Sequence, residues 1–178
     1  AERRREDTIS GRAELRYDSV NKGRTAMARV DASGADGALV VHADGVYRDQ
    51  DDYDTPDGKQ LNSFVETRTG GLGVSYIGAD GFIGMSASRY DNRYGNPGEP
   101  GDLSAGEAGV SLDMLQNRFE LKAGIDKDFW IFDGLRGSFA STTYEHTEFE
   151  GADVGTFFTN EAEEGRLELT HRAFGQWT

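Results

Sequence analysis

His146 and Glu148 form the pair whose residue types and spacing point most directly to metal chemistry. They are two residues apart in a segment with strand-like alternation, and side chains at that spacing lie on the same face of a strand. An imidazole and a carboxylate suit zinc or another divalent metal. A polar strand end explains the same pair, and two ligands do not complete a site. The sequence therefore offers His146 and Glu148 as candidate metal ligands that need partners from elsewhere.

Two acidic segments are the next feature with chemical potential. Residues 48–62 hold five aspartates, and residues 147–164 hold six acidic residues without any lysine or arginine. The aspartates do not follow the EF-hand order, in which alternating Asp or Asn residues lead into a glycine, so a solvated loop explains them better than a calcium site. We expect the acids of 147–164 to repel anions and to concentrate cations near them.

Motifs of enzymes do not occur in the chain. There is no Gly-x-Ser-x-Gly, no phosphate-binding loop and no His-Glu-x-x-His, and the acidic pairs are too numerous to single out a glycosidase dyad. We expect a protein that is not an enzyme and that holds no cofactor. The other two histidines, His42 and His171, are interpreted as ordinary polar positions.

Composition narrows the class of protein further. The 178 residues carry 32 acidic and 19 basic side chains, a net charge of −13, which argues against a nucleic-acid partner. The absence of cysteine excludes disulfides and thiolate chemistry. The length fits one domain over 1–178, or part of a larger one. No apolar run is long enough for a membrane helix, and Arg3 to Arg5 are not followed by the apolar stretch of a signal peptide. The chain is therefore expected to be either soluble or a β-barrel.

Alternation with a period of two recurs along the chain and predicts β-strands. In 9–18 the alternation has no exception: one face is apolar or glycine, and the other is charged apart from Ser10. The pattern returns in 26–31, 39–48, 72–76, 83–87 and 118–125, and more weakly in 135–149 and 158–171. The parity of the apolar positions slips between Met114 and Phe119, which suggests a bulge. We therefore expect about eight strands, with the least certain ones at the C-terminal end.

The connections between these strands alternate in length. After 21–23 they run short, long, short, long, short, long: the short ones are 33–37, 78–81 and 126–134, each closing on Asp-Gly, and the long ones are 48–62, 91–107 and 147–164. Asp-Gly supplies the positive φ of a tight hairpin. If the strands run up and down in order, all long loops lie at one end and all Asp-Gly turns at the other.

This combination is typical of an outer-membrane β-barrel, whose strands put apolar residues toward lipid and polar residues toward the lumen. The predicted fold is all-β: an antiparallel up-and-down meander of about eight strands, forming a transmembrane β-barrel or a segment of one. Aromatic residues near strand ends would form interfacial girdles, among them Tyr17, Tyr47, Tyr76, Trp130 and Phe132. A soluble β-sandwich also alternates, but its core would be poorly filled by the many Gly and Ala residues of the apolar rows.

Several segments also resemble the barrel region of TonB-dependent outer-membrane receptors. They are GRAELRY at 11–17, HADGVYRDQDDY at 42–53, GFIGMSASRYDNRYGNPG at 81–98, HTEFEG at 146–151 and EGRLEL at 164–169. The resemblance covers nearly the whole chain. It implies an outer-membrane location in a Gram-negative bacterium, contact with outer-membrane lipid, and a part in the uptake of a scarce nutrient such as a metal or metal chelate.

The chain departs from that family in what it lacks. The family has a plug domain, a TonB box and a far larger number of strands, whereas about eight strands are expected here, with neither plug nor TonB box. The resemblance thus implies a barrel segment that would reach TonB only through a plug outside these residues. Two other interpretations stay open, namely a self-contained eight-stranded outer-membrane barrel with a structural or adhesive role, and a soluble β-sandwich binding module. The transported substrate and the oligomeric state do not follow from the sequence.

Overall fold

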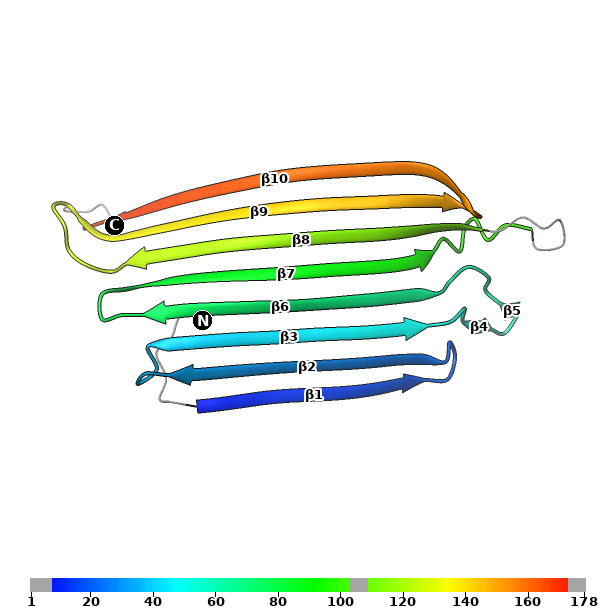
Figure 1. Ribbon diagram of the computed structural model, residues 1–178, viewed down its shortest axis with the longest axis horizontal. Coiled ribbons are helices and arrows are strands. Elements are labelled where there is room, and N and C mark those ends of the chain that lie inside the picture. Colours follow the sequence, from blue (N-terminus) through cyan, green and yellow to red (C-terminus); the bar gives the residue numbers. More distant parts are fainter. Residues whose placement is uncertain (1–7, 103–108, 173–178) are drawn as a thin grey trace.

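The computed structural model describes residues 8–102 and 109–172, and all of its regular structure is β (Figure 1). Eight long strands form one sheet, and two short ones form a small separate hairpin. The long strands are β1 (Thr8–Asp18), β2 (Gly23–Gly34), β3 (Leu39–Gln50), β6 (Val65–Ile77), β7 (Gly81–Gly95), β8 (Val110–Ile125), β9 (Phe132–Glu150) and β10 (Asp153–His171). The hairpin consists of β4 (Asp54–Thr55) and β5 (Gly58–Lys59).

The strand order is a simple meander, β1-β2-β3-β6-β7-β8-β9-β10, with every neighbour antiparallel. The predicted all-β antiparallel meander of about eight strands is therefore confirmed. Over the described residues, β1 pairs with β2 alone and β10 with β9 alone, so the sheet has two edges. The strands lengthen steadily along the chain, from 11 residues in β1 to 19 in β10.

The turns divide between the two ends of the sheet largely as the sequence predicts (Figure 1). At one end the strands are joined by the short turns 35–38, 78–80 and 126–131; we call this the turn end. At the other end lie 19–22, 51–64 with the β4–β5 hairpin, 96–102 with Gly109, and 151–152; we call this the loop end. Positive φ angles at Ala35, Asp36 and Gly37 close the first tight turn.

The predicted long loop at 147–164 is wrong. These residues instead complete β9 and begin β10, and only a tight turn at 151–152 separates the two strands, with Gly151 at φ 68°. The acidic residues of this segment alternate with Thr, Phe and Val, which have high strand propensity. Charged side chains are tolerated in such a strand because they are exposed to solvent.

The bulge expected between Met114 and Phe119 is also absent. β8 pairs with β7 in unbroken register over this stretch, so Met114 and Phe119 lie on opposite faces of the sheet. Irregularities in register occur elsewhere, between β9 and β10 at Val154/Thr156 and at Thr170/His171. The apparent slip arose because Met114 is an apolar residue on the polar face.

The sheet is a single layer with almost no core (Figure 1). Among the described residues, the buried apolar ones are Ala38, Val40 and Ala140, and no large side chain is fully buried. The described part of the chain also contains no helix with the length and apolar character needed to cross a bilayer. A layered soluble domain buries one face of its sheet against a second element, and here the described residues supply no such element.

Candidate functional site

One face of the sheet carries a continuous apolar band. The strand registers place the following side chains on that face: Ile9, Leu15 and Tyr17 on β1; Ala26, Ala28, Val30 and Ala32 on β2; Leu39, Val41, Ala43 and Tyr47 on β3; Leu72, Val74 and Tyr76 on β6; Ile83, Met85 and Ala87 on β7; Phe119, Leu121, Ala123 and Ile125 on β8; Leu135 and Phe139 on β9; Leu167 and Leu169 on β10. Most of the large ones are exposed, Leu15 to 83%. Exposed apolar surfaces of this extent are typical of regions that contact a partner protein, a ligand or a membrane.

The edge of the apolar band that faces the loop end runs obliquely across the sheet. On β2 the band stops at Ala26, just before Arg24, whereas on β10 it stops at Leu167, short of Glu163. The residues paired in sequence with Leu167, across the six strand pairs from β10 to β2, form one row that ends at Gly34 on β2. Gly34 lies eight residues from Ala26, where the band ends on β2. With ~3.3 Å per residue and ~4.8 Å between strands, this is a slope of roughly 40° against the hydrogen-bonded rows.

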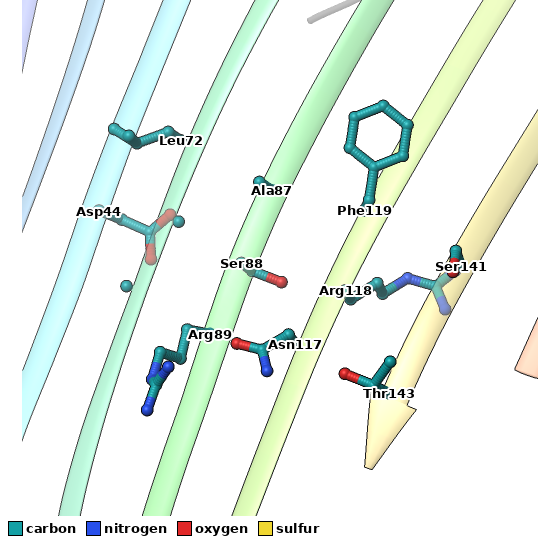
Figure 2. A pocket seen from close by; sticks show the side chains of 12 residues that line it. Asp44, Leu72, Ala87, Ser88, Arg89, Asn117, Arg118, Phe119, Ser141 and Thr143 are labelled. Carbon is teal, nitrogen blue, oxygen red and sulfur yellow. The ribbon is translucent and has the colours of Figure 1, made fainter. Parts of the chain in front are cut away.

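A hollow of about 580 Å³ lies where the edge of the band crosses β6 to β9, and its lining also includes Asp44, Ser88 and Arg118, which the registers place on the opposite face. Figure 2 shows Leu72, Ala87 and Phe119 along one side of it and Arg89 and Asn117 along the other. Thr143 lies on the same polar side. Within two residues along each strand, the surface thus changes from apolar to polar, and the change is sharp.

The opposite face, which we call the polar face, is held by ion pairs between neighbouring side chains. At its centre His42 lies between two carboxylates: Nδ1 is 2.8 Å from Oδ1 of Asp31, and Nε2 is 2.8 Å from Oδ1 of Asp44. The second oxygen of Asp31 accepts a hydrogen bond of 2.8 Å from Arg29. His42 therefore links β2 to β3 on this face, a more specific role than the ordinary polar position that its sequence context suggested.

A second cluster of ion pairs crosses β8 and β10. Arg118 lies 3.6 Å from Glu120 and 3.5 Å from Glu164, and Lys122 lies 3.1 Å from Glu120. Between this cluster and His42 is a hollow of about 250 Å³. It is lined mainly by small and polar residues, including Gly73, Ser75, Gly84 and Ser86, together with Val40 and Phe82. The polar face is thus a charged surface that carries small hollows.

The loops at the loop end are tied to one another through Asn62. Its side-chain amide donates to the carbonyl oxygens of Asn96 at 3.0 Å, Glu99 at 3.2 Å and Val110 at 2.5 Å. Asn62 itself adopts φ 59°, a left-handed conformation that asparagine tolerates better than most residues. One side chain therefore fixes the 51–64 loop against the segment between β7 and β8.

Two aspartates of the 48–62 segment, Asp52 and Asp54, also hold parts of this loop together. Asp52 accepts a hydrogen bond of 2.7 Å from the backbone N–H of Ser63, whose hydroxyl donates to the carbonyl of Gln60. Asp54 pairs with Lys59 at 3.1 Å across the β4–β5 hairpin. These contacts tie parts of the loop together through its own side chains.

His146 and Glu148 lie on the polar face of β9, two residues apart, as predicted. Nδ1 of His146 is 3.1 Å from the hydroxyl of Tyr144, and its ring stacks on Phe158 of β10 with centroids 5.4 Å apart. Among the described residues, no group of three His, Cys, Asp or Glu side chains is placed to hold a metal ion. The pair thus remains a prediction, with one imidazole nitrogen already within hydrogen-bonding distance of a neighbour.

The outer half of the β9–β10 hairpin is acidic on both faces. Glu145, Glu161 and Glu163 lie on the side of the apolar band, above its edge, and Glu148 and Glu164 lie on the polar face. No lysine or arginine occurs between Ser141 and Gly165. This hairpin therefore carries a concentrated negative charge, and it favours cations over anions nearby.

No protein-family model matches the chain. The apolar band, the His42 bridge and the Asn62 contacts are therefore described from the geometry of the sheet alone. Sequence patterns located the apolar band, but they missed the Asn62 contacts and the His42 bridge, because both depend on which strands and loops are neighbours. The sequence carries a weak signal for Asn62, because asparagine is common in turns and this residue lies shortly before a strand.

Proposed function

We propose that this sheet is the wall of an outer-membrane β-barrel, with the apolar band against lipid and the polar face toward the lumen. The observation that carries this proposal is the slope of the band. In transmembrane barrels the strands are tilted about 35 to 45° from the barrel axis, so a lipid layer meets them obliquely. An apolar region that crosses the hydrogen-bonded rows at roughly 40° is what such a layer requires.

The height of the apolar band supports the same proposal. On β3 it extends from Leu39 to Tyr47, or about 26 Å along the strand, and at the inferred tilt this is roughly 20 Å along the membrane normal. The apolar zone of outer-membrane barrels is about 25 Å tall. Tyr17 and Tyr47 lie at its loop-end border, where aromatic residues are favoured.

We further propose that the sheet belongs to a TonB-dependent receptor that takes up a scarce nutrient. Three features support this: the segments that resemble that family, the ordered loops around Asn62, and the acidic β9–β10 hairpin at the loop end. The acidic hairpin favours a cationic substrate, such as a divalent metal, over an anionic chelate. His146 and Glu148 are its proposed ligands, completed by side chains from elsewhere. In this proposal TonB acts through a plug that is not among these residues.

A self-contained eight-stranded barrel with an adhesive or structural role is the second candidate, because the strand number suits a small barrel. Its closure would pair β1, with 11 residues, against β10, with 19 residues. Much of the edge of β10 would then stay unpaired beyond the end of β1. The unequal lengths therefore favour a larger wall over a closed eight-stranded one.

The experiment that tests a membrane wall is the dependence of folding on detergent. We expect the purified chain to gain its β-type circular dichroism and resistance to urea only in detergent micelles or lipid vesicles. A monomeric, folded chain in plain buffer would refute the membrane proposal and favour the soluble β-sandwich. Heat-modifiable mobility on gels distinguishes a closed eight-stranded barrel from an open wall, because only the closed barrel resists unfolding by the gel detergent as a monomer.

The metal proposal has its own test, zinc titration by calorimetry of the folded chain. His146→Ala and Glu148→Gln should each weaken zinc binding at least about tenfold. Glu150→Gln, two residues further along β9 on the same face, should change it little. Equal binding by all variants would remove His146 and Glu148 as ligands.

A further inference from the structure

The polar face of β7 to β10, which lie side by side in Figure 1, changes character toward the loop end. Two neighbouring rows of paired residues there carry rings and amides: Tyr90, Gln116, Tyr144 and Asn160 in one row, and His146 and Phe158 in the next. We call these six residues the aromatic–amide surface. The other positions of the second row, Asn92 and Met114, are also uncharged. Charged side chains begin one row beyond on either side, with Arg118 and with Glu148.

Three rings of this surface pack against one another and leave part of their area open. His146 stacks on Phe158 with centroids 5.4 Å apart, and Tyr144 meets them edge-on at 5.7 and 6.1 Å. Phe158 is 48% exposed and Tyr90 is 39% exposed. Tyr90 lies two strands away from Tyr144, or ~10 Å across the sheet. The surface therefore offers two separate aromatic platforms to a ligand.

The two amides of the surface stand beside these platforms. Gln116 lies between Tyr90 and Tyr144, and Asn160 lies on the other side of Tyr144. Within the part of the chain that the structure describes, neither side-chain amide has a hydrogen-bond partner. Asn160 is exposed and Gln116 is half-buried. Each amide thus presents both N–H donors and an acceptor oxygen to an incoming molecule.

We propose that the aromatic–amide surface binds an uncharged carbohydrate chain. The C–H faces of sugar rings are apolar and pack flat on aromatic rings, which supply large contact areas. Sugar hydroxyls donate and accept hydrogen bonds, as the two amides do. Although the chain carries a net charge of −13, the surface contains no Asp, Glu, Lys or Arg, so its chemistry complements a neutral ligand. The open amides distinguish it from a purely apolar docking face.

This inference goes beyond the proposed function and does not depend on it, because the surface requires only the pairing of β7 to β10. The other face of the same strands carries Asn117 and Glu145 at this height, beyond the edge of the apolar band. In the proposed wall, the surface would therefore lie above the lipid, on the lumen side and open to the loop end.

The test measures binding of the full chain to three neutral hexasaccharides of different linkage: maltohexaose, cellohexaose and mannohexaose. The chain is held in amine-oxide micelles, whose headgroup is not a sugar, and EDTA is present so that no metal contributes. Saturation-transfer NMR detects weak binding and reports which sugar protons lie near aromatic rings. We expect transfer to the ring C–H protons of at least one hexasaccharide. No transfer to any of the three overturns the proposal.

Neighbouring residues on opposite faces supply matched variants. Phe158→Ser should weaken carbohydrate binding at least about fivefold, because the most exposed ring of the surface is lost. Phe157→Ser should leave it unchanged, since Phe157 is 62% exposed but faces the other way. Circular dichroism in the same micelles checks that both variants keep their strands. Equal losses in the two variants, or no loss in Phe158→Ser, would contradict the proposal.

The amides have a matched pair of their own. Gln116→Ala should weaken binding about fivefold through the lost hydrogen bonds, whereas Asn117→Ala, on the opposite face of β8, should not. The same binding in both variants would remove the amide from the site.

Two further comparisons separate this surface from other ligands and from the membrane wall. Tetramethylammonium chloride should not displace the hexasaccharide, and displacement would assign the rings to an organic cation in place of a sugar. A chain that folds and binds the hexasaccharide in plain buffer keeps this inference and refutes the membrane wall. A chain that folds only in micelles and binds none of the sugars refutes this inference alone.

Discussion

The first three strands and the last three of this sheet share the same alternation, but they differ in how far the apolar face extends along each strand. In β1 to β3 the apolar face extends over nearly the whole strand, as from Leu39 to Tyr47. In β8 to β10 it occupies only the half nearest the turn end, and the outer half of β9 and β10 is rich in acidic residues, with Val154, Phe157 and Phe158 exposed among them. The long strands therefore consist of two zones, one suited to lipid and one suited to water.

This difference shows that alternation alone does not define a membrane-facing surface. Alternation assigns each residue to a face, and the border of the apolar band assigns it a height. Because that border crosses the rows obliquely, a residue of one row lies within the apolar band on β2 and outside it on β10. In the proposed wall, the later strands project beyond the lipid at the loop end and carry the acidic hairpin with them.

The largest expected effect comes from a charge placed inside the apolar band. Met85→Arg should destabilise the folded sheet in lipid by about 2 to 4 kcal/mol, because the guanidinium would have to enter the hydrocarbon zone. Urea unfolding in vesicles, followed by circular dichroism, measures this change.

Ser88→Arg on the same strand is the matched control, since it adds the same group to the exposed, polar face. It should change the unfolding free energy by less than about 1 kcal/mol. Similar losses at positions 85 and 88 would mean that the two faces of β7 do not meet different media. Val41→Arg on β3 should reproduce the loss seen at Met85.

The next largest effect is expected where Asn62 joins the 51–64 loop to the segment between β7 and β8. Asn62→Ala removes the amide whose two N–H bonds are shared among three carbonyl oxygens and places alanine at a positive φ, and we expect a loss of about 1 to 3 kcal/mol in local stability. Faster amide exchange at Asn96 and Val110, whose carbonyls Asn62 binds, would report it.

Asn62→Gly separates the two causes, because glycine keeps the backbone conformation and removes only the amide. A loss as large as that of alanine assigns the effect to the hydrogen bonds. Gln60→Ala, in the same loop, removes one hydrogen bond to the carbonyl of Pro97 and should have a smaller effect. Unaltered exchange in all three variants would contradict the role of Asn62 in joining the loops.

A smaller effect is expected in the acidic hairpin. Combined Glu161→Gln and Glu163→Gln should reduce the enrichment of cations at the loop end, without loss of fold, because both side chains are exposed. The affinity for zinc or calcium at low ionic strength should fall a few-fold, and the difference should shrink as salt is added. A salt-independent change would indicate direct ligands in place of a general field.

The smallest effect is expected from His42→Gln on the polar face of the shorter strands. Glutamine keeps one hydrogen bond to the flanking Asp31 or Asp44 and loses the bridge between them. These groups are partly exposed, so solvent and salt screen their interaction. We expect a small, salt-dependent shift in the urea midpoint. A shift as large as that of Met85→Arg would show that the polar face is dry.

Much of the fold was predictable from the sequence because a period of two is a strong local signal. The faces of 9–18 and 39–48 follow from side-chain type alone, and so do the tight turns at 33–37 and 78–81. The prediction that 147–164 is a loop was wrong because the same acidic composition suits both a solvated loop and an exposed strand. Pairing of β9 with β8 and of β10 with β9 makes these residues strands, since it supplies hydrogen bonds that no local pattern reports.

The candidate site was predictable only where it depends on residues close in sequence. His146 and Glu148 share a face because they are two residues apart on a strand. The His42 bridge needs Asp31 from the neighbouring strand, and Asn62 needs carbonyl groups more than thirty residues away. Such contacts depend on register and on loop geometry, and both follow from the assembled sheet.

The meander topology also has a consequence for how the sheet is assembled. Each long strand pairs with the next long strand along the chain, so no distant segment has to be found before a ladder forms. The sheet is able to grow by addition of one hairpin after another, each new strand using the previous one as its template. A chain shortened by β1 or by β10 should therefore keep the remaining ladders in register, since neither edge strand holds any other pair together.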